Sequence, residues 1–458
     1  MTYYFDLFGC VKNQVDAENM MASLNRVGWV AAKNAEDADL IIINSCGFIE
    51  SAKRESIDAV LSWRKHYSEK KILLAGCLAQ RYAEELAAEL SEADGFFGTD
   101  DLSGIVKAAE KIMHTAKKTK EQKVPCHETE GSRPLLSMPG SAYVKISEGC
   151  DNRCSFCAIP IIRGGLKSRS VREIVEECKT LLKRGIKELC LIAQDSGSYG
   201  KDLFAPASDI SANDVSSADT SGVSTSASLP ILLEALSLLK GEFRVRLLYI
   251  HPDHFPLQIL DIMEQDSRFL PYFDIPFQHG SEKILKAMNR KGNAGTYLKL
   301  IKTIRHRLPD AVMRSTFLTG FPGETEEDFA QLLDFQKKAR LDWVGCFAYS
   351  REEGTASYSM KNRVAKKAAI ERKRLVEEQQ ALITEKQMNR FIGKAFDVLL
   401  EEEFSSDGDF LYLGRLPCHA PDVDGAAVVS SSGPLELGAM IPCRVVARAG
   451  FDLEVEVF

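Results

Sequence analysis

The chain has 458 residues, more than one ordinary hydrophobic core accommodates, so we expect two to four domains. With 45% hydrophobic and 27% charged residues it has the composition of a soluble globular protein, and no apolar run reaches the roughly 18 residues of a membrane-spanning helix. The net charge of −7 argues against a generic nucleic-acid binder.

The N-terminus shows no basic segment followed by an apolar one, so we expect no export signal and a cytoplasmic location. In that reducing compartment the twelve cysteines should be core residues, metal ligands or catalytic groups, and not disulfides. The assignment of these cysteines therefore decides the function.

Residues 1–115 alternate short apolar runs with amphipathic stretches, which predicts a parallel α/β sandwich. The expected strands are Tyr3–Phe8, Leu40–Ile43, Lys71–Ala75 and Phe96–Phe97, and the expected helices are Asp16–Arg26, Ile49–Lys65, Arg81–Leu90 and Leu102–His114.

Three cysteines, Cys10, Cys46 and Cys77, follow the ends of three of these strands by one to three residues. Ligands of an open parallel sheet bind on the loops after the carboxyl ends of its strands, so the three thiols should converge on one metal site. The alternative is that they are small buried residues in tight, glycine-containing turns.

Residues 116–141 lack apolar periodicity and read as a linker, and residues 142–388 resume the alternation of strands and helices. The expected strands are Tyr143–Ile146, Glu188–Ala193, Arg244–Tyr249, Tyr272–Ile275, Val312–Leu318 and Trp343–Tyr349. Six such units suit a partial or full α/β barrel of the TIM type, with its chemistry at the carboxyl ends of the strands. The Ser- and Ala-rich segment 205–228 should be a disordered insertion without a catalytic part.

Residues 389–458 carry five short β-rich runs, which predict a small OB-like β-barrel. They hold twelve Asp and Glu against five Lys and Arg, so this unit carries the whole charge imbalance of the chain. An acidic module repels phosphate and attracts basic protein surfaces, although it can also be merely a soluble acidic domain.

Cys150, Cys154 and Cys157 form a CxxxCxxC motif directly after the first strand of the expected barrel. One short loop can thus hold three corners of an iron–sulfur cubane and leave the fourth iron open. A zinc ribbon would need a second CxxC pair or suitably spaced histidines. Cys178 and Cys190 lie in apolar segments and should be core residues, and the simplest interpretation of the remaining cysteines, Cys126, Cys346, Cys418 and Cys443, is a structural one.

The CxxxCxxC motif, with Phe156 before its last cysteine, resembles the radical S-adenosylmethionine superfamily. The upstream stretches LFGCVKNQVDAEN, INSCGFIESAKRESI and AGCLAQRY resemble its methylthiotransferase branch, with departures at Val11 and Ala17. Six other stretches resemble those members of the branch that modify the twelfth protein of the small ribosomal subunit: ISEGCDNRCSFCAIPIIRG, KELCLIAQDSGSYGKDL, RLLYIHPDH, FDIPFQHGS, TGFPGETEEDF and APDVDG. The tail resembles the TRAM domain of the same proteins.

The resemblance implies two [4Fe-4S] clusters in separate pockets, a radical S-adenosylmethionine cluster on Cys150, Cys154 and Cys157 and an auxiliary cluster on Cys10, Cys46 and Cys77. It further implies that cleavage of S-adenosylmethionine yields a 5′-deoxyadenosyl radical, which takes hydrogen from the β-carbon of an aspartate, and that a methylthio group is then added there.

Side chains near the strand ends are candidates for contact with S-adenosylmethionine: Gln194, Gln278 and Arg314. His251 and His254 have HxxH spacing but no evident third ligand, so a polar loop is the better interpretation. In Gly320–Thr325 we expect a tight strand-to-helix turn, with Thr325 as the N-cap reaching Asp328; direct contact with the cofactor is the alternative.

An electron donor such as flavodoxin or ferredoxin is the expected partner besides the ribosomal protein. Two other functions remain open. The same clusters could methylthiolate an adenosine of transfer RNA, although the acidic tail argues against a transfer RNA substrate. A non-catalytic, zinc-stapled binding module is the second alternative.

Overall fold

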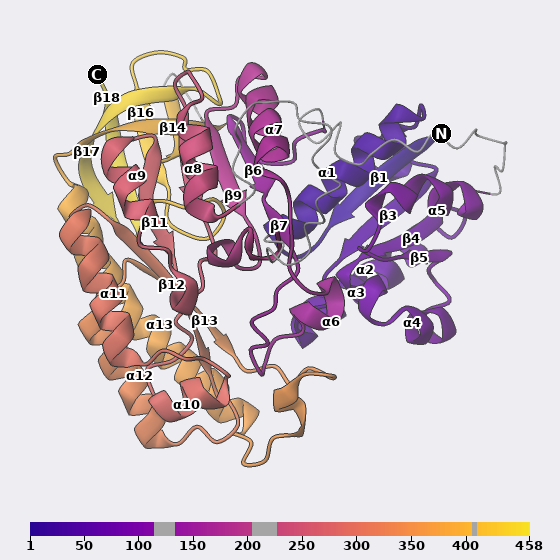
Figure 1. Cartoon of the computed structure of the whole chain (residues 1–458). Coiled ribbons are helices and arrows are strands. Elements are labelled where there is room, and N and C mark those ends of the chain that lie inside the picture. Colours follow the sequence, from indigo (N-terminus) through magenta and orange to yellow (C-terminus); the bar gives the residue numbers. More distant parts are fainter. Residues whose placement is uncertain (114–132, 204–226, 405–409) are drawn as a thin grey trace, which may run out of the picture.

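The computed structural model describes residues 1–113, 133–203, 227–404 and 410–458. Three units follow one another along the chain: an N-terminal sheet, a central sheet and a C-terminal barrel (Figure 1). Most of the predicted linker and insertion, together with Cys126, lies outside the described residues. Within the described ranges, none of the helices combines the length and the apolar character of a membrane span.

The N-terminal unit is a parallel five-stranded sheet in the order β2-β1-β3-β4-β5, with helices on both faces. Helices α1 and α5 cover one face, and α2, α3 and α4 cover the other, so the predicted α/β sandwich is confirmed. The elements are β1 Thr2–Leu7, α1 Val11–Arg26, β2 Val30–Ala31, β3 Leu40–Ser45, α2 Glu50–His66, β4 Lys71–Gly76, α3 Cys77–Arg81, α4 Ala83–Glu89, β5 Gly95–Phe97 and α5 Ile105–Ile112.

Two predicted helices of this unit differ from the structure. Helix α1 begins at Val11 instead of Asp16, because its first turn buries the polar residues Lys12 and Asn13, which an apolar pattern does not reveal. The helix expected over Arg81–Leu90 is two short helices, broken at Tyr82, whose backbone (φ −132°, ψ 39°) is not helical.

The central unit is an open, parallel sheet of six strands in the order β13-β12-β11-β10-β9-β6, which confirms a partial barrel. Helices pack on one face of this sheet, and its other face meets the C-terminal barrel. The elements are β6 Ser141–Lys145, β7 Ser147–Glu148, α6 Ile159–Arg163, β8 Lys167–Ser168, α7 Val171–Lys183, β9 Glu188–Ile192, α8 Leu229–Ser237, β10 Arg244–Leu247, α9 Ile259–Gln265, β11 Phe269–Asp274, α10 Glu282–Ala287, α11 Ala294–Arg307, β12 Val312–Thr319, α12 Glu326–Ala339, β13 Trp343–Ala348 and α13 Lys366–Met388.

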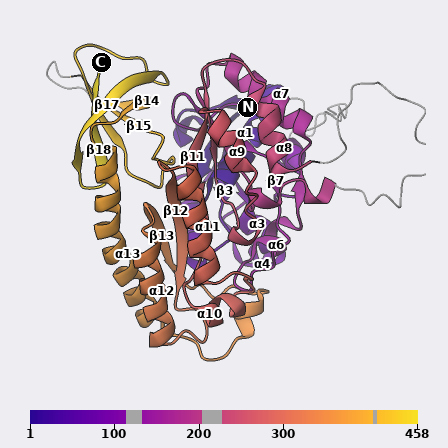
Figure 2. The ribbon, with the colours of Figure 1, turned by 60° about the vertical axis from the view of Figure 1, so that its left-hand side comes forward.

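The C-terminal unit is a closed barrel in the order β14-β15-β16-β18-β17, as predicted, and α13 leads into it (Figure 2). Its strands are β14 Ala395–Glu403, β15 Phe410–Arg415, β16 Ala427–Ser431, β17 Met440–Ala449 and β18 Asp452–Val457. A buried ion cluster fixes the barrel on the central sheet: Glu188 of β9 pairs with Arg244, Arg246 and Arg415. Removing one partner of such a cluster would leave buried charge uncompensated, so the barrel is held in a defined position.

The described end of the predicted linker is packed against the N-terminal and central units. Arg133 is fully buried and pairs with Glu18 of α1 and Glu177 of α7. This cation therefore joins the N-terminal unit to the central unit on one side of the molecule.

Candidate active site

All six predicted ligand cysteines line one cavity of about 320 Å³. Cys10, Cys46 and Cys77 stand at the carboxyl ends of β1, β3 and β4, as the strand-end rule predicts. The other triad comes from the loop after β7. The expectation of two separate pockets is thus wrong, because both triads line the same cavity.

Helix packing brings the two triads together. Helix α6 follows the CxxxCxxC loop and contacts α3, which begins at Cys77 (Figure 1). Cys77, Ala158 and Ile162 form a small buried apolar cluster, with Phe48 packed against it. This seam fixes the position of one triad relative to the other.

The CxxxCxxC loop begins at a glycine that no other residue can replace without strain. Gly149 has φ +71°, and a Cβ at this position would stand 2.0 Å from the carbonyl oxygen of Gly165. Gly164, on the facing segment, has a similar φ of +72° but open space around its Cβ position. Alanine substitutions at the two glycines therefore distinguish the cost of backbone strain, which both share, from the cost of a steric clash, which only Gly149 has.

We expect Gly149→Ala to displace the loop and to reduce iron binding strongly, because it adds a clash to the cost of a left-handed alanine. Gly164→Ala should cost only about 1–2 kcal/mol of backbone strain and keep its iron. Thermal unfolding and iron content of the two variants check this. Equal iron losses in both would contradict it.

Burial governs the acidity of the thiols that line this cavity. It raises the pKa of Cys77 and of Cys157 to about 12, and that of Cys150 to about 11. Iron binds the thiolate, so a cluster must displace these protons. Cations on the cavity wall, Lys12, Arg163 and Arg290, can offset the charge of the thiolates that result.

Two of the three candidates for S-adenosylmethionine contact line this cavity, Gln194 and Gln278. Gln194 Nε2 donates to Glu148 Oε1 at 2.6 Å, whereas its buried Oε1 has no hydrogen-bond partner within the described part of the chain. An orphaned buried acceptor suits a ligand that brings a donor. Gln278 and Tyr249, which also lines this cavity, have positive φ values of 70° and 62°, strain of the kind that gathers at functional sites.

Arg314 lies elsewhere. It lines a second cavity of about 450 Å³ between the three units, and its guanidinium stands 3.3 Å from Asp274 and 3.4 Å from Asp424. Cys10 and Tyr249 line both cavities, so the two spaces adjoin. Arg314 is the third residue of β12, far from its carboxyl end, which explains its distance from the cysteines.

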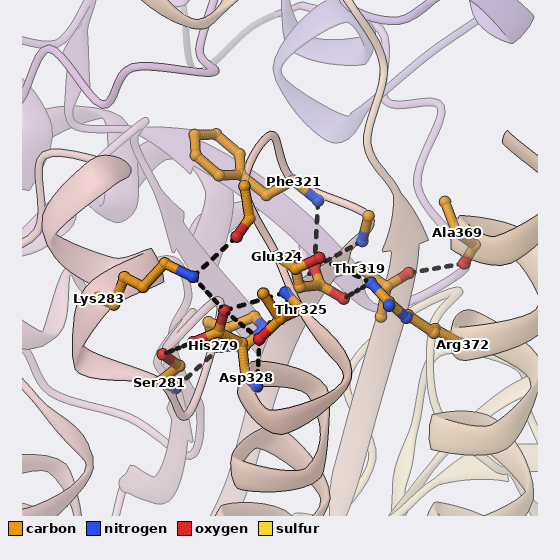
Figure 3. Close-up of polar contacts among 12 residues, drawn as sticks. His279, Ser281, Lys283, Thr319, Phe321, Glu324, Thr325, Asp328, Ala369 and Arg372 are labelled. Carbon is orange, nitrogen blue, oxygen red and sulfur yellow. Dashed lines mark hydrogen bonds and ion pairs between the residues drawn. The ribbon is translucent and has the colours of Figure 1, made fainter. Parts of the chain in front are cut away.

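The segment Gly320–Thr325 forms the predicted tight turn (Figure 3). None of its residues lines the six-cysteine cavity. Glu324 accepts hydrogen bonds from the backbone N–H of Gly320 (2.7 Å) and of Phe321 (3.1 Å) and pairs with Arg372 of α13 at 2.8 Å. The N-cap role of Thr325 is confirmed, because Thr325 and Asp328 form a capping box.

Figure 3 also shows His279 close to this turn. His279 Nε2 faces Glu324 Oε2 at 3.7 Å, and His279 Nδ1 accepts the N–H of Ser281 at 2.9 Å. His279 follows Gln278 directly, so the turn fixes the backbone from which Gln278 reaches the cavity.

The HxxH pair belongs to a polar loop, as expected. His254 Nδ1 lies 2.9 Å from Asp195 Oδ2, which also accepts Asn152 Nδ2 at 2.9 Å, so the pair supports the cysteine loop. Among the described residues, no three His, Cys, Asp or Glu side chains converge on a single ion. In a cubane each thiolate binds a different iron, so its ligands stand further apart.

Family comparisons match all three units. Residues 2–98 match the family described as "Uncharacterized protein family UPF0004", residues 144–335 match the radical SAM superfamily, and residues 392–458 match the TRAM domain. Two relatives named "Ribosomal protein uS12 methylthiotransferase RimO" align over nearly their whole length: 48% identity for Treponema denticola (98% of this chain, 99% of that one) and 39% for Thermotoga maritima (94% of each). The chain belongs to the RimO family.

It is therefore a radical S-adenosylmethionine methylthiotransferase, as the motifs predicted. Membership in the radical SAM superfamily implies a [4Fe-4S] cluster and S-adenosylmethionine as cofactors. Among solved structures, the radical S-adenosylmethionine methyltransferase TsrM of Kitasatospora setae is similar, with a TM-score of 0.51, 12% identity and coverage of 78% of this chain and 76% of that one. That similarity shows the fold alone.

Sequence reasoning missed several residues of this RimO-family cavity: Lys12, Asn13, Tyr249, Arg163 and Arg290. The positive φ of Tyr249 is a backbone feature that no sequence pattern announces. The core assignment of the other described cysteines is confirmed, since Cys178, Cys190, Cys346, Cys418 and Cys443 are all buried.

Proposed function

We propose that this protein carries two [4Fe-4S] clusters and adds a methylthio group to the β-carbon of an aspartate in ribosomal protein uS12. The observation that carries the proposal is the single cavity lined by two cysteine triads in a chain of this family. Cys150, Cys154 and Cys157 would hold the radical S-adenosylmethionine cluster, and Cys10, Cys46 and Cys77 the auxiliary one.

When bound, the first cluster supplies the electron that cleaves S-adenosylmethionine, and the second supplies the sulfur. The protein binds and orients. Gln194 Oε1 would accept from a donor on S-adenosylmethionine, and Gln278 would contact it as a second residue of the cavity lining. Phe156, Ile159 and Ile162 line the same cavity and would exclude water from the radical.

We propose that the target aspartate enters through the second cavity, which reaches the first at Cys10 and Tyr249. Each unit contributes one exposed apolar side chain to its lining: Leu7 (40% exposed), Phe347 (50%) and Val423 (53%). Arg314 lies deeper, where it could pair with the target carboxylate. The C-terminal barrel would thus form one wall of the substrate site.

Asp422 on this wall is exposed, and its carboxylate accepts the Tyr143 hydroxyl at 3.3 Å. We expect Asp422→Asn to raise the KM for a basic ribosomal protein about two- to five-fold, since an exposed ion pair contributes up to ~1 kcal/mol. The matched control is Glu436→Gln, exposed on the same barrel and outside the cavity lining. Steady-state assays with both variants test this, and equal effects would contradict it.

The function itself is tested by anaerobic turnover with S-adenosylmethionine and dithionite, offering the small-subunit ribosomal protein and transfer RNA in parallel. Mass spectrometry should find the methylthio gain on the protein. A gain on the RNA alone would establish the alternative substrate, and colourless, zinc-loaded protein without turnover would establish the binding module.

Flavodoxin or ferredoxin is the class of electron donor we propose, because cleavage of the sulfonium requires a one-electron reductant of low potential. We also propose the cytoplasm as the location, since the proposed substrate is a ribosomal protein.

A further inference from the structure

Arg163 is buried in the wall of the cavity that both cysteine triads line. It is the last residue of α6, six positions after Cys157, and only 2% of its side chain is exposed. Its Nη1 stands 3.0 Å from Glu148 Oε1 in the central unit, and its Nη2 stands 2.9 Å from Asp16 Oδ2 on α1. One carboxylate from the N-terminal unit and one from the central unit therefore hold this cation.

The same guanidinium reaches a proposed cluster ligand. Nη2 lies 3.1 Å from Cys77 Sγ and 2.6 Å from Asn13 Oδ1. Asn13 is fixed in turn, because its Nδ2 donates to the carbonyl oxygen of Ser45 at 2.8 Å, beside Cys46. The nitrogen is thus aimed at the sulfur by groups that belong to the N-terminal unit.

Glu148 connects Arg163 to the other half of the cavity. Its Oε1 accepts from Arg163 and also from Gln194 Nε2, and its Oε2 pairs with Lys145 at 2.6 Å. A single carboxylate therefore links the cation beside Cys77 to the glutamine proposed to contact S-adenosylmethionine.

The other cations of the cavity wall point to other partners. Lys12 Nζ lies over the ring of Tyr249, 3.0 Å from its centroid, and Arg290 Nη1 donates to the carbonyl oxygen of Pro276 at 2.9 Å. Arginine stays protonated throughout and donates in a fixed planar geometry. Arg163 is thus suited to supply a permanent hydrogen bond to a thiolate at Cys77.

Hydrogen bonds to sulfur and nearby positive charge both raise the reduction potential of an iron–sulfur cluster. We propose that Arg163 is a positioning residue that sets the potential of the cluster on Cys10, Cys46 and Cys77 by its hydrogen bond to Cys77 and its charge. This inference rests on the proposed function, because it requires that second cluster.

The test isolates the second cluster in the full-length chain. A background variant that combines Cys150→Ala, Cys154→Ala and Cys157→Ala should keep about four irons per chain after anaerobic reconstitution, as for one cubane. A redox titration followed by electron paramagnetic resonance then gives the midpoint potential of that cluster alone.

In this background we expect Arg163→Gln to lower the midpoint potential by at least about 59 mV, a ten-fold change in the reduction equilibrium of a one-electron couple. Arg163→Lys keeps the positive charge but loses the planar set of guanidinium donors, so it should lower the midpoint potential by a smaller amount. The control is Arg268→Gln, which removes a partly buried arginine paired with Asp266, outside the cavity lining, and should leave the potential unchanged.

The outcomes separate the two proposals. A background chain that binds no iron overturns the two-cluster assignment, and this inference with it. Iron retained with an unchanged potential in Arg163→Gln overturns the role of Arg163 alone. If Arg163→Gln does not retain the cluster, the midpoint potential of Arg163→Lys is measured instead. A potential of Arg163→Lys equal to that of the background chain would then refute the proposal.

Discussion

Cys154→Ala should abolish the reductive cleavage of S-adenosylmethionine. Cys154 is the middle ligand of the CxxxCxxC loop and lines the cavity together with Gln278 and Arg290. Its loss leaves two thiolates for a cluster that already keeps one iron open, so the cluster should not form. We expect the rate of 5′-deoxyadenosine formation to fall by more than about a hundredfold. Losing a residue that only hydrogen-bonds to a metal ligand already costs up to about a hundredfold, and Cys154 is itself a ligand.

The matched control for this prediction is Cys346→Ala. Cys346 on β13 is buried but lines neither cavity, so its replacement should cost about 1 kcal/mol of stability and leave cleavage intact. Liquid chromatography of 5′-deoxyadenosine and iron content per chain check both variants. Cleavage at the normal rate by Cys154→Ala would refute the ligand assignment.

The cysteine sites were predictable because two simple rules act on them. Cys150, Cys154 and Cys157 are close in the chain, so their spacing alone suggests one loop around one cluster. Cys10, Cys46 and Cys77 are far apart, yet the parallel sheet places the carboxyl ends of β1, β3 and β4 at one edge. What the sequence could not show is that both triads face one cavity, which depends on the packing of α6 on α3.

Buried polar residues were the main source of error. Lys12 and Asn13 are polar, so their positions read as solvent-exposed, although the structure buries both in the first turn of α1. Arg163 looks like an ordinary helix-terminal arginine until the fold places Asp16 and Cys77 beside it. Such residues become visible only when both units are assembled.

Some of the acidic side chains of the C-terminal unit are paired inside the molecule and are largely shielded from solvent. Glu401 pairs with Arg415 at 2.8 Å, and Asp424 is buried between Arg314 and the hydroxyl of Tyr272, which donates to it at 2.5 Å. Composition therefore overstates the acidic surface that a partner meets. Asp422, exposed beside the second cavity, is a better guide to that surface than the net charge.

Cys46→Ala should separate the two chemical steps. Cys46 follows β3 directly, and its thiol faces the common cavity from the N-terminal unit. Because the CxxxCxxC loop stays intact, cleavage of S-adenosylmethionine should remain within about two-fold of normal, while iron falls from about eight to about four per chain. Methylthio product should then drop by more than about a hundredfold, because the sulfur has no holder.

The control for this prediction is Cys178→Ala on α7, fully buried in the core of the central unit. It should keep about eight irons and form product at a near-normal rate, which shows that losing a buried thiol is not enough to stop transfer. Anaerobic assays that quantify 5′-deoxyadenosine and methylthiolated protein in the same sample provide the ratio that matters. Product formation by Cys46→Ala in step with cleavage would mean that the transferred sulfur does not depend on this triad, and the second cluster would have to be placed elsewhere.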